Sequence, residues 1–91
     1  MIEIMWKNPI SISVENGEYK IKSALSGVYD ILNYSDNDIL INRNGDFTQN
    51  ENCGNYITLP AGAAYNDLVI NHCDIYIKSS GSGTVTINRK G

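Results

Sequence analysis

The stretch from Asn55 to Asn88 constrains the fold most strongly, because its apolar residues recur at every second position. A period of two places successive side chains on opposite faces of a β-strand. The alternation is interrupted by three groups of turn-forming residues: Leu59-Pro60-Ala61-Gly62, Asn71-His72 and Ser79-Ser80-Gly81-Ser82-Gly83. No part of the chain sustains the 3.6-residue period of a helix. The pattern therefore predicts short strands joined by tight turns.

Length and composition agree with this interpretation. A chain of 91 residues is long enough for one domain, and its thirteen Ile and twelve Asn favour strands and turns respectively. We predict an all-β fold, a small β-sandwich or jelly roll of about eight short antiparallel strands with little or no helix. Residues 1–9, which end at Pro9, are predicted to form an N-terminal arm or edge strand, and residues 10–91 a single β-sandwich domain.

Two hairpins are predicted from local turn signals. Asn16-Gly17 favours a two-residue type I′ turn, which would pair Val14 with Tyr19 and Ile12 with Ile21. The Gly/Ser-rich loop at residues 79–83 is predicted to close a final hairpin, with Val85 and Ile87 facing inward. Leu59 to Gly62 fits a type I turn with Pro at its second position. We also expect a polar turn at residues 33–38 and a surface loop at residues 48–54.

Metal and cofactor sites are not expected. Cys53, His72 and Cys73 are too few for a structural zinc site, and neighbours on a strand point to opposite faces. Both cysteines are expected to be free thiols. Oxygen-rich turns at residues 36–38 and 42–46 leave calcium as an alternative, although the second turn lacks the closing Glu of an EF-hand loop. Asx-rich turns also form without any ion.

Catalysis is not expected either. His72 is the only histidine, and no Ser, Cys or Asp stands at a spacing typical of a catalytic triad or nucleophile elbow. No glycine-rich phosphate loop joins a strand to a helix. We therefore predict that the protein is not an enzyme, with no catalytic, cofactor-binding or metal-binding residues.

Charge and hydropathy also exclude some partners. The net charge is −3 and the Lys and Arg residues are scattered, so nucleic acid is not an expected partner. No apolar run is long enough to span a membrane, and residues 1–4 lack the features of a signal peptide. We expect a protein made in a cytoplasm that does not bind membranes.

Outward-facing positions of the predicted strands form a candidate contact surface. Tyrosine and tryptophan rings stack well on the apolar faces of sugars, so a carbohydrate-binding module that uses Tyr56, Tyr76 or Trp6 is one hypothesis. The candidate contact residues are Trp6, Tyr56, Tyr76, Lys78 and Thr86.

Pro60-Ala61-Gly62-Ala63-Ala64-Tyr65 resembles the second conserved box of the cupin jelly rolls. In that family a metal-binding histidine follows the proline and glycine turn, whereas here Tyr65 stands at the histidine position. The other cupin box, with its paired histidines, is missing. The resemblance thus implies a jelly-roll fold without the cupin metal.

Residues 27–89 resemble the small structural proteins of tailed bacteriophages, namely head-decoration, head-fibre and neck or tail proteins. The resemblance lies in the succession of strand, LPAG turn, IYIK strand, Gly/Ser loop and TVTI strand. It implies a non-enzymatic virion component, made in the host cytoplasm, that forms a homo-oligomer and binds other virion proteins. The alternative hypotheses are a carbohydrate-binding module and an acidic phage protein that inhibits a host enzyme.

Overall fold

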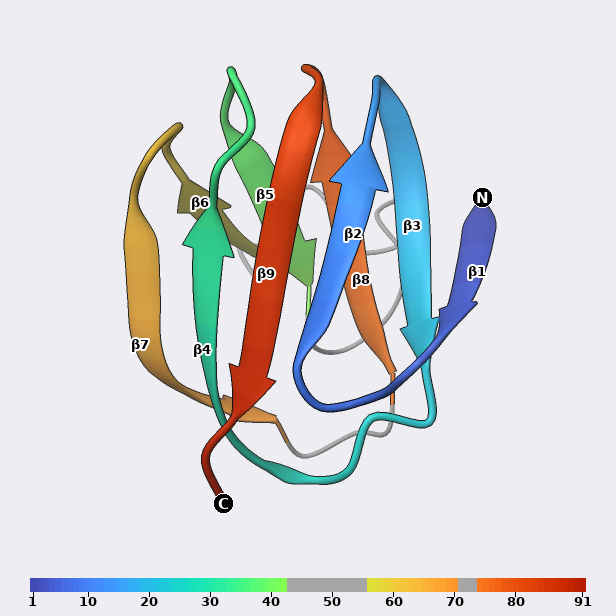
Figure 1. The fold of residues 1–91 in the computed structure, drawn as a ribbon, viewed down its shortest axis with the longest axis vertical. Coiled ribbons are helices and arrows are strands. Elements are labelled where there is room, and N and C mark those ends of the chain that lie inside the picture. Colours follow the sequence, from blue (N-terminus) through green and yellow to red (C-terminus); the bar gives the residue numbers. More distant parts are fainter. Residues whose placement is uncertain (43–55, 71–73) are drawn as a thin grey trace.

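The computed structural model describes residues 1–42, 56–70 and 74–91. These residues form nine β-strands and no helix (Figure 1). The strands are β1 (Ile2–Met5), β2 (Ile10–Val14), β3 (Gly17–Lys22), β4 (Gly27–Asn33), β5 (Ile39–Asn42), β6 (Tyr56–Leu59), β7 (Ala64–Ile70), β8 (Ile75–Ser79) and β9 (Gly83–Arg89). The predicted all-β sandwich is confirmed.

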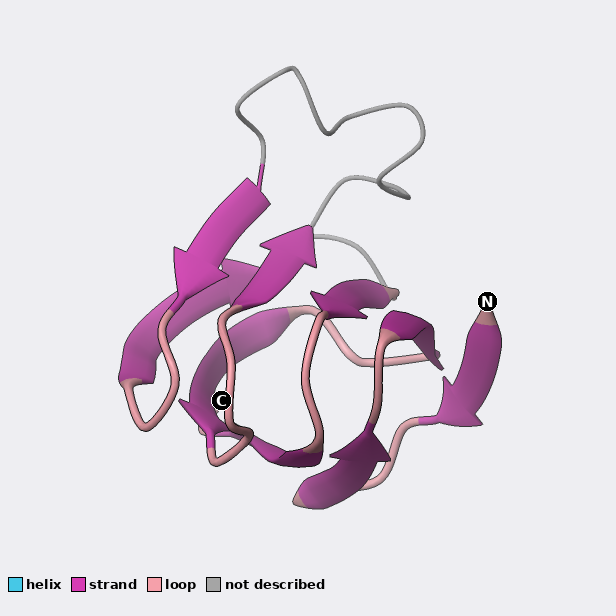
Figure 2. Cartoon of the chain, turned by 90° about the horizontal axis from the view of Figure 1, so that it is seen from above, coloured by secondary structure: helices cyan, strands magenta, loops and turns pink. Residues whose placement is uncertain are grey.

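The strands form two sheets that pack face to face (Figure 2). The five-stranded sheet has the order β1-β3-β8-β5-β6, and the four-stranded sheet has the order β2-β9-β4-β7. Strands β2 to β9 thus follow the order of a jelly roll, in which two Greek keys fold over one another. All their pairings are antiparallel, whereas β1 is an additional edge strand that runs parallel to β3.

The predicted hairpin at Asn16-Gly17 is wrong. β2 pairs with β9, where Ile12 lies opposite Val85, and β3 pairs with β8, where Tyr19 lies opposite Ile77. The chain crosses from one sheet to the other between β2 and β3. Alternation correctly places the apolar side chains of both strands in the interior, but it does not tell a neighbour in the same sheet from one across the core.

The predicted final hairpin is wrong for the same reason. β8 lies in the five-stranded sheet and β9 in the four-stranded sheet, so the segment between them connects the two sheets. Val85 and Ile87 are fully buried, as expected. Gly81 and Gly83 allow residues 34–37 to pass close by, because a Cβ on Gly83 would lie 2.5 Å from the Ser35 Cα atom. Close backbone approach therefore explains glycine at this position.

The core is built mainly from isoleucine, whose branched side chain packs well on a pleated sheet. Apart from β1, the inward rows of both sheets are mostly buried. Two tyrosines reach the ends of the core with their rings buried and their hydroxyls bonded to backbone. The Glu15 amide donates to the Tyr19 hydroxyl at 2.7 Å, and the Tyr29 hydroxyl donates to the Leu25 carbonyl. Trp6 packs edge-on against Tyr29, with ring centroids 5.3 Å apart.

The turn after β6 begins one residue later than predicted. The Ala63 amide donates to the Pro60 carbonyl at 3.1 Å, so the turn comprises residues 60–63. Gly62 is its third residue and has a φ of 77°. Type II turns require this conformation at the third position, which glycine adopts without steric cost.

Several predicted features lie outside the described residues. These are Cys53, His72 and Cys73, the loop at residues 48–54, and residues 43–46 of the second oxygen-rich turn. In the part of the chain that the structure describes, no helix has the length and apolar character needed to cross a membrane.

Candidate binding surface

The outward face of the five-stranded sheet brings together polar and aromatic side chains from β8, β5 and β6. Strand register arranges them in rows that run across the sheet. One row contains Lys78, Leu40 and Thr58, contributed by β8, β5 and β6. The next row contains Tyr76, Asn42 and Tyr56 from the same three strands, and Asn42 in the middle of this row is fully buried. The two rows bring together residues that lie as far as 38 positions apart in the sequence, between Leu40 and Lys78.

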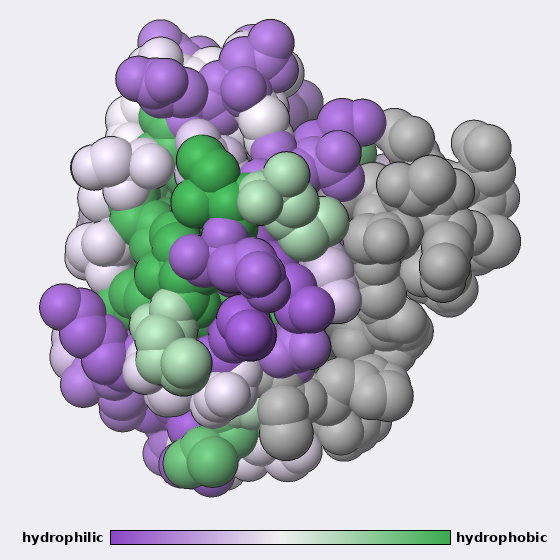
Figure 3. All heavy atoms as spheres, turned by 90° about the vertical axis from the view of Figure 1, so that its right-hand side faces the viewer, coloured by the Kyte–Doolittle hydropathy of each residue, from purple (hydrophilic) through white to green (hydrophobic). Residues whose placement is uncertain are grey.

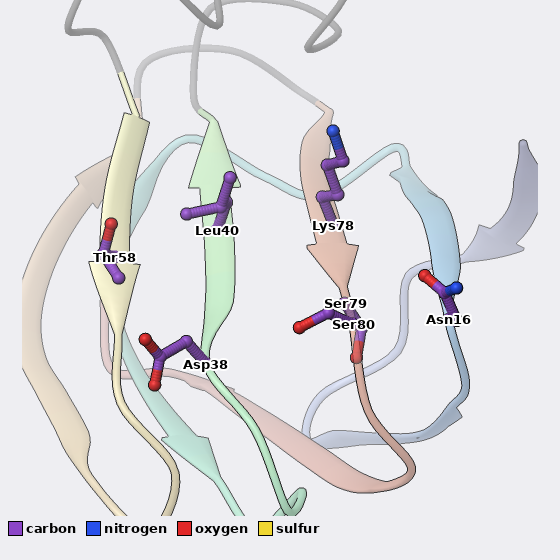
Figure 4. A pocket seen from close by; sticks show the side chains of 7 residues that line it. All are labelled: Asn16, Asp38, Leu40, Thr58, Lys78, Ser79 and Ser80. Atoms are coloured by element: carbon purple, nitrogen blue, oxygen red, sulfur yellow. The ribbon is translucent and has the colours of Figure 1, made fainter.

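A pocket of about 250 Å³ opens on this face beside the first row (Figure 4). We call it the outer pocket. The Leu40 side chain lies between Thr58 on β6 and Lys78 on β8, and Asp38 lies at the start of β5 (Figure 4). The residues that line the outer pocket are Asn16, Asp38, Leu40, Thr58, Lys78, Ser79 and Ser80.

The fully buried Asn33 side chain supports one wall of the outer pocket. Its amide group donates to the carbonyls of Asn37 and Leu59, both at 2.9 Å. Its carbonyl oxygen accepts from the Ser35 amide at 3.0 Å and from the Ser35 hydroxyl at 2.5 Å. Asn37 precedes Asp38, and Leu59 follows Thr58. Asn33 therefore fixes the backbone next to two residues of the pocket.

Asp36 and Asp38 have different roles in the β4–β5 connection. The Asp36 carboxylate accepts from the Ser82 amide at 2.8 Å, and the Asp36 amide donates to the Ser82 carbonyl at 3.0 Å. These two hydrogen bonds join the β4–β5 connection to the segment before β9, so Asp36 has a structural role. The Asp38 side chain is exposed and has no hydrogen-bond or ion-pair partner among the described residues, so its oxygens are available as acceptors.

Lys20 and Tyr76 form a second polar contact on the same face. The Lys20 ammonium lies 5.5 Å from the centre of the Tyr76 ring and 3.7 Å from an Asp74 carboxylate oxygen. The hydrogen bond with Tyr76 is the main cause that raises the pKa of Lys20, and Asp74 adds to it. Lys20 therefore stays charged at neutral pH and holds one side of the Tyr76 ring.

The predicted contact residues divide into three places. Tyr56, Tyr76 and Lys78 lie together on the outward face of the five-stranded sheet. Thr86 lies on the outward face of the other sheet, where its hydroxyl is 3.0 Å from that of Ser11. Trp6 is half-buried against Tyr29. These five residues thus do not form one continuous surface.

Sequence reasoning missed Asn16, Asp38, Leu40 and Thr58 as neighbours of Lys78. Their juxtaposition follows from the pairing of β8 with β3 and β5 and of β5 with β6, and no local pattern specifies these pairings. Asn33 was also missed as a buried residue, because an Asn that precedes other turn-forming residues is typical of an exposed turn.

A second candidate surface lies at the free edge of β1. Sheet β1-β3-β8-β5-β6 has one more strand than the sheet it covers, so β1 extends beyond it. Ile2 and Ile4 pair in register with the inward-facing Tyr19 and Ile21, but Ile2 is 56% exposed. Met1 and Met5 are exposed beside it, by 59% and 63%. Figure 3, which faces this side, shows a broad apolar area.

No group of three or more His, Cys, Asp or Glu side chains capable of holding a metal ion occurs in residues 1–42, 56–70 and 74–91. Comparison with known proteins finds no match to this chain among protein-family models, curated proteins or solved structures.

Proposed function

We propose that this protein is a non-enzymatic structural protein that self-associates through the free edge of β1, as a component of a phage virion. The observation that supports this proposal is the uncovered inner face of β1. A strand at a sheet edge has unpaired backbone groups that can bind another strand, and exposed apolar residues add a hydrophobic driving force.

The chemistry of β1 suits a second copy of the same chain. A two-fold interface brings identical patches together, so the two β1 edges would lie side by side and the exposed Ile2 side chains of both copies would come close together. This contact would bury more of the apolar surface of β1 than either chain buries alone. Glu3, the charged residue within β1, lies 3.6 Å from the ammonium of Lys22 on the outward face, so it does not place an unpaired charge against the apolar patch.

The other sheet edges are less suited to this contact. β7 has an irregular register opposite Tyr29 and Ile31, and Asp67 in this region has a φ of 62°. Such bulges protect an edge against strand addition. β2 directs its apolar residues into the core and exposes Ser11 and Ser13. At β6, the other edge of the five-stranded sheet, the inward-facing Leu59 is only 3% exposed. β1 is thus the edge strand whose inward-facing row is most exposed among the described residues.

The fold is compatible with the virion assignment. Jelly rolls occur in viral capsid domains and in lectins, although a fold alone does not specify a function. The sequence resemblance to phage structural proteins supports the virion part of the proposal. The genes next to this one test that part: capsid or tail genes are expected there, and a metabolic operon would contradict it.

Light scattering coupled to size-exclusion chromatography tests self-association. We expect the unaltered chain to be an oligomer and Ile2→Lys to be a monomer, because two ammonium groups would meet at the two-fold interface. Val69→Lys is the matched control, since Val69 is a 48% exposed apolar residue on the edge strand β7. A strictly monomeric unaltered chain at high protein concentration would refute the proposal, as would equal effects of the two substitutions.

A further inference from the structure

The outer pocket differs from an ordinary sheet surface in being hollow. Side chains on the outward face of a sheet normally stand side by side and leave no cavity. Here Leu40 and Thr58 are short compared with their neighbour Lys78, and the β4–β5 connection and the segment before β3 form the rim. The result is a partly open pocket of about 250 Å³ that is not involved in the β1 edge.

The charges in the outer pocket favour a neutral ligand. The lining contains one carboxylate, Asp38, and one ammonium group, Lys78, and Glu18 lies opposite Lys78 on the neighbouring strand β3. A strongly charged ligand would meet a group of its own sign on one side of the pocket. A neutral ligand hydroxyl can donate a hydrogen bond to the Asp38 carboxylate.

The remaining polar groups favour a ligand with several hydroxyls. Thr58 and Ser80 contribute hydroxyl groups, and Asn16 contributes an amide, which can donate and accept. An ionised carboxylate such as Asp38 accepts from two neighbouring hydroxyls of a ligand. These donors and acceptors surround an apolar centre, the Leu40 side chain, against which the C–H face of a sugar ring can pack.

The pocket is also rigid, which lowers the entropic cost of binding. The Asp38 amide donates to the Asn37 side chain at 3.0 Å, and the Asn37 carbonyl accepts from the Asn33 amide group at 2.9 Å. On the other side the Ser79 hydroxyl donates to the Gly81 carbonyl at 2.9 Å. Both walls are thus held by hydrogen bonds that do not involve a ligand.

From this geometry we propose that the outer pocket binds one neutral sugar unit of a glycan. The pocket is small and open to solvent on one side, so the rest of the glycan would extend away from the protein. This binding does not depend on self-association at β1, which lies on the other side of β3 in the same sheet.

Nuclear magnetic resonance titration of the ¹⁵N-labelled protein tests the proposal. The probes are the methyl glycosides of glucose, galactose, mannose and N-acetylglucosamine, together with the corresponding free sugars. We expect saturable shifts from at least one methyl glycoside, confined to the amides of residues 38–40, 58–59 and 78–80. Binding of free sugars alone would refute the glycan assignment, because a glycan unit has a substituted anomeric oxygen.

Two substitutions locate the site. Asp38→Ala should weaken binding about tenfold, as expected when a charge-assisted hydrogen bond is lost. Thr58→Tyr should abolish binding by filling the pocket. Ser13→Tyr is its matched control, because Ser13 is exposed on β2, an edge strand of the four-stranded sheet. Ile2→Lys should bind the sugar with unchanged affinity, which separates this proposal from that of self-association.

The proposal would be overturned if no methyl glycoside gave saturable shifts in the protein with its pocket intact. It would also be overturned if the shifts mapped to the Thr86 face, or if Thr58→Tyr and Ser13→Tyr bound equally well. Tighter binding of methyl glucuronide, which carries a carboxylate, than of methyl glucoside would contradict the neutral ligand class.

Discussion

At the scale of single residues, Asn33 is a buried polar residue whose side chain forms four hydrogen bonds. It is fully buried, and its side chain uses both amide hydrogens and both acceptor sites of its carbonyl oxygen. A buried polar network stabilises a fold only if its members are satisfied. Asn33 links the ends of β4 and β6 to the connection that leads into β5, so it fixes the corner next to the outer pocket.

Asn33→Ala should lower the free energy of unfolding by about 2–4 kcal/mol, because the Leu59 carbonyl and the Ser35 amide would lose buried partners. Urea unfolding monitored by circular dichroism measures this change. Asn88→Ala is the control, since Asn88 lies half-buried on an outward sheet face and should change stability by less than about 0.5 kcal/mol. Equal effects of both substitutions would contradict the structural role of Asn33.

Lys90 joins two carboxylates near the carboxyl-terminal end of β9. Its ammonium lies 3.0 Å from an Asp30 oxygen and also contacts Asp67. The hydrogen bond from Lys90 is the main cause that lowers the pKa of Asp30, and the Asp67 amide contributes a second bond. The hydrogen bonds to Asp67 and Asp30 raise the pKa of Lys90. Asp30 and Lys90 are thus both ionised at neutral pH.

These shifts predict how stability depends on pH. Asp30 has a lower pKa in the folded than in the unfolded chain, so its contribution is present above the unfolded pKa of about 3.9 and is lost as pH falls through the folded pKa. Lys90→Met should therefore reduce the loss of stability on acidification below about pH 4. Urea midpoints measured from pH 7 to pH 2 test this prediction. Lys7→Met, at an exposed residue outside the strands, should leave the pH dependence unchanged.

At the scale of elements, the neighbouring β4–β5 connection restricts which residues fit at the start of β9. Gly83 has a φ of 146°, and a Cβ there would meet the Ser35 Cα atom at 2.5 Å and the Tyr34 carbonyl oxygen at 3.0 Å. Both contacts are with backbone that is itself bonded across the corner, since the Tyr34 amide donates to the Thr84 carbonyl at 2.8 Å. Neither side can move without breaking this pairing.

Gly83→Ala should therefore destabilise the fold by at least about 2 kcal/mol. Gly17→Ala is the matched control, because Gly17 also begins a strand but a Cβ there meets no atom within 4 Å. We expect Gly17→Ala to change stability by less than about 0.5 kcal/mol, as measured by thermal and urea unfolding. A small effect of Gly83→Ala would show that the corner can relax.

At the scale of the whole molecule, the fold depends on pairings between distant parts of the chain. Ile10 lies opposite Ile87, which joins the beginning and end of the jelly roll, whereas β1 is attached only through β3. Strands β2 to β9 complete both sheets of the jelly roll without β1. β1 thus contributes more to the surface of the molecule than to its core.

Removal of residues 1–5 should leave a folded jelly roll. Of the residues removed, only Ile4 is partly buried, so we expect the free energy of unfolding to fall by about 1–3 kcal/mol. The truncated chain should also be monomeric. Circular dichroism melts and light scattering measure the two effects. A truncated chain that does not fold would show that β1 belongs to the core, and one that still forms oligomers would place the interface elsewhere.

The positions of most strands and the direction in which their side chains point follow from local sequence patterns. Period-two alternation reports whether a residue faces the core, and Ile12, Tyr19, Ile77 and Val85 are all buried as this pattern predicts. Turn-forming residues mark where strands end. Both signals are local, so they recover an all-β sandwich from the printed residues alone.

Which strands lie next to one another is not encoded in these local patterns and becomes defined only in the folded chain. Alternation is the same whether the next strand lies in the same sheet or in the other one. The two segments that were expected to form hairpins instead connect one sheet to the other. The outer pocket depends on this outcome, because register places Leu40 between Thr58 and Lys78. The separation of Trp6 and Thr86 from Tyr76 has the same origin. The physical reason is that pairing is selected by the packing of the complete core, to which every strand contributes.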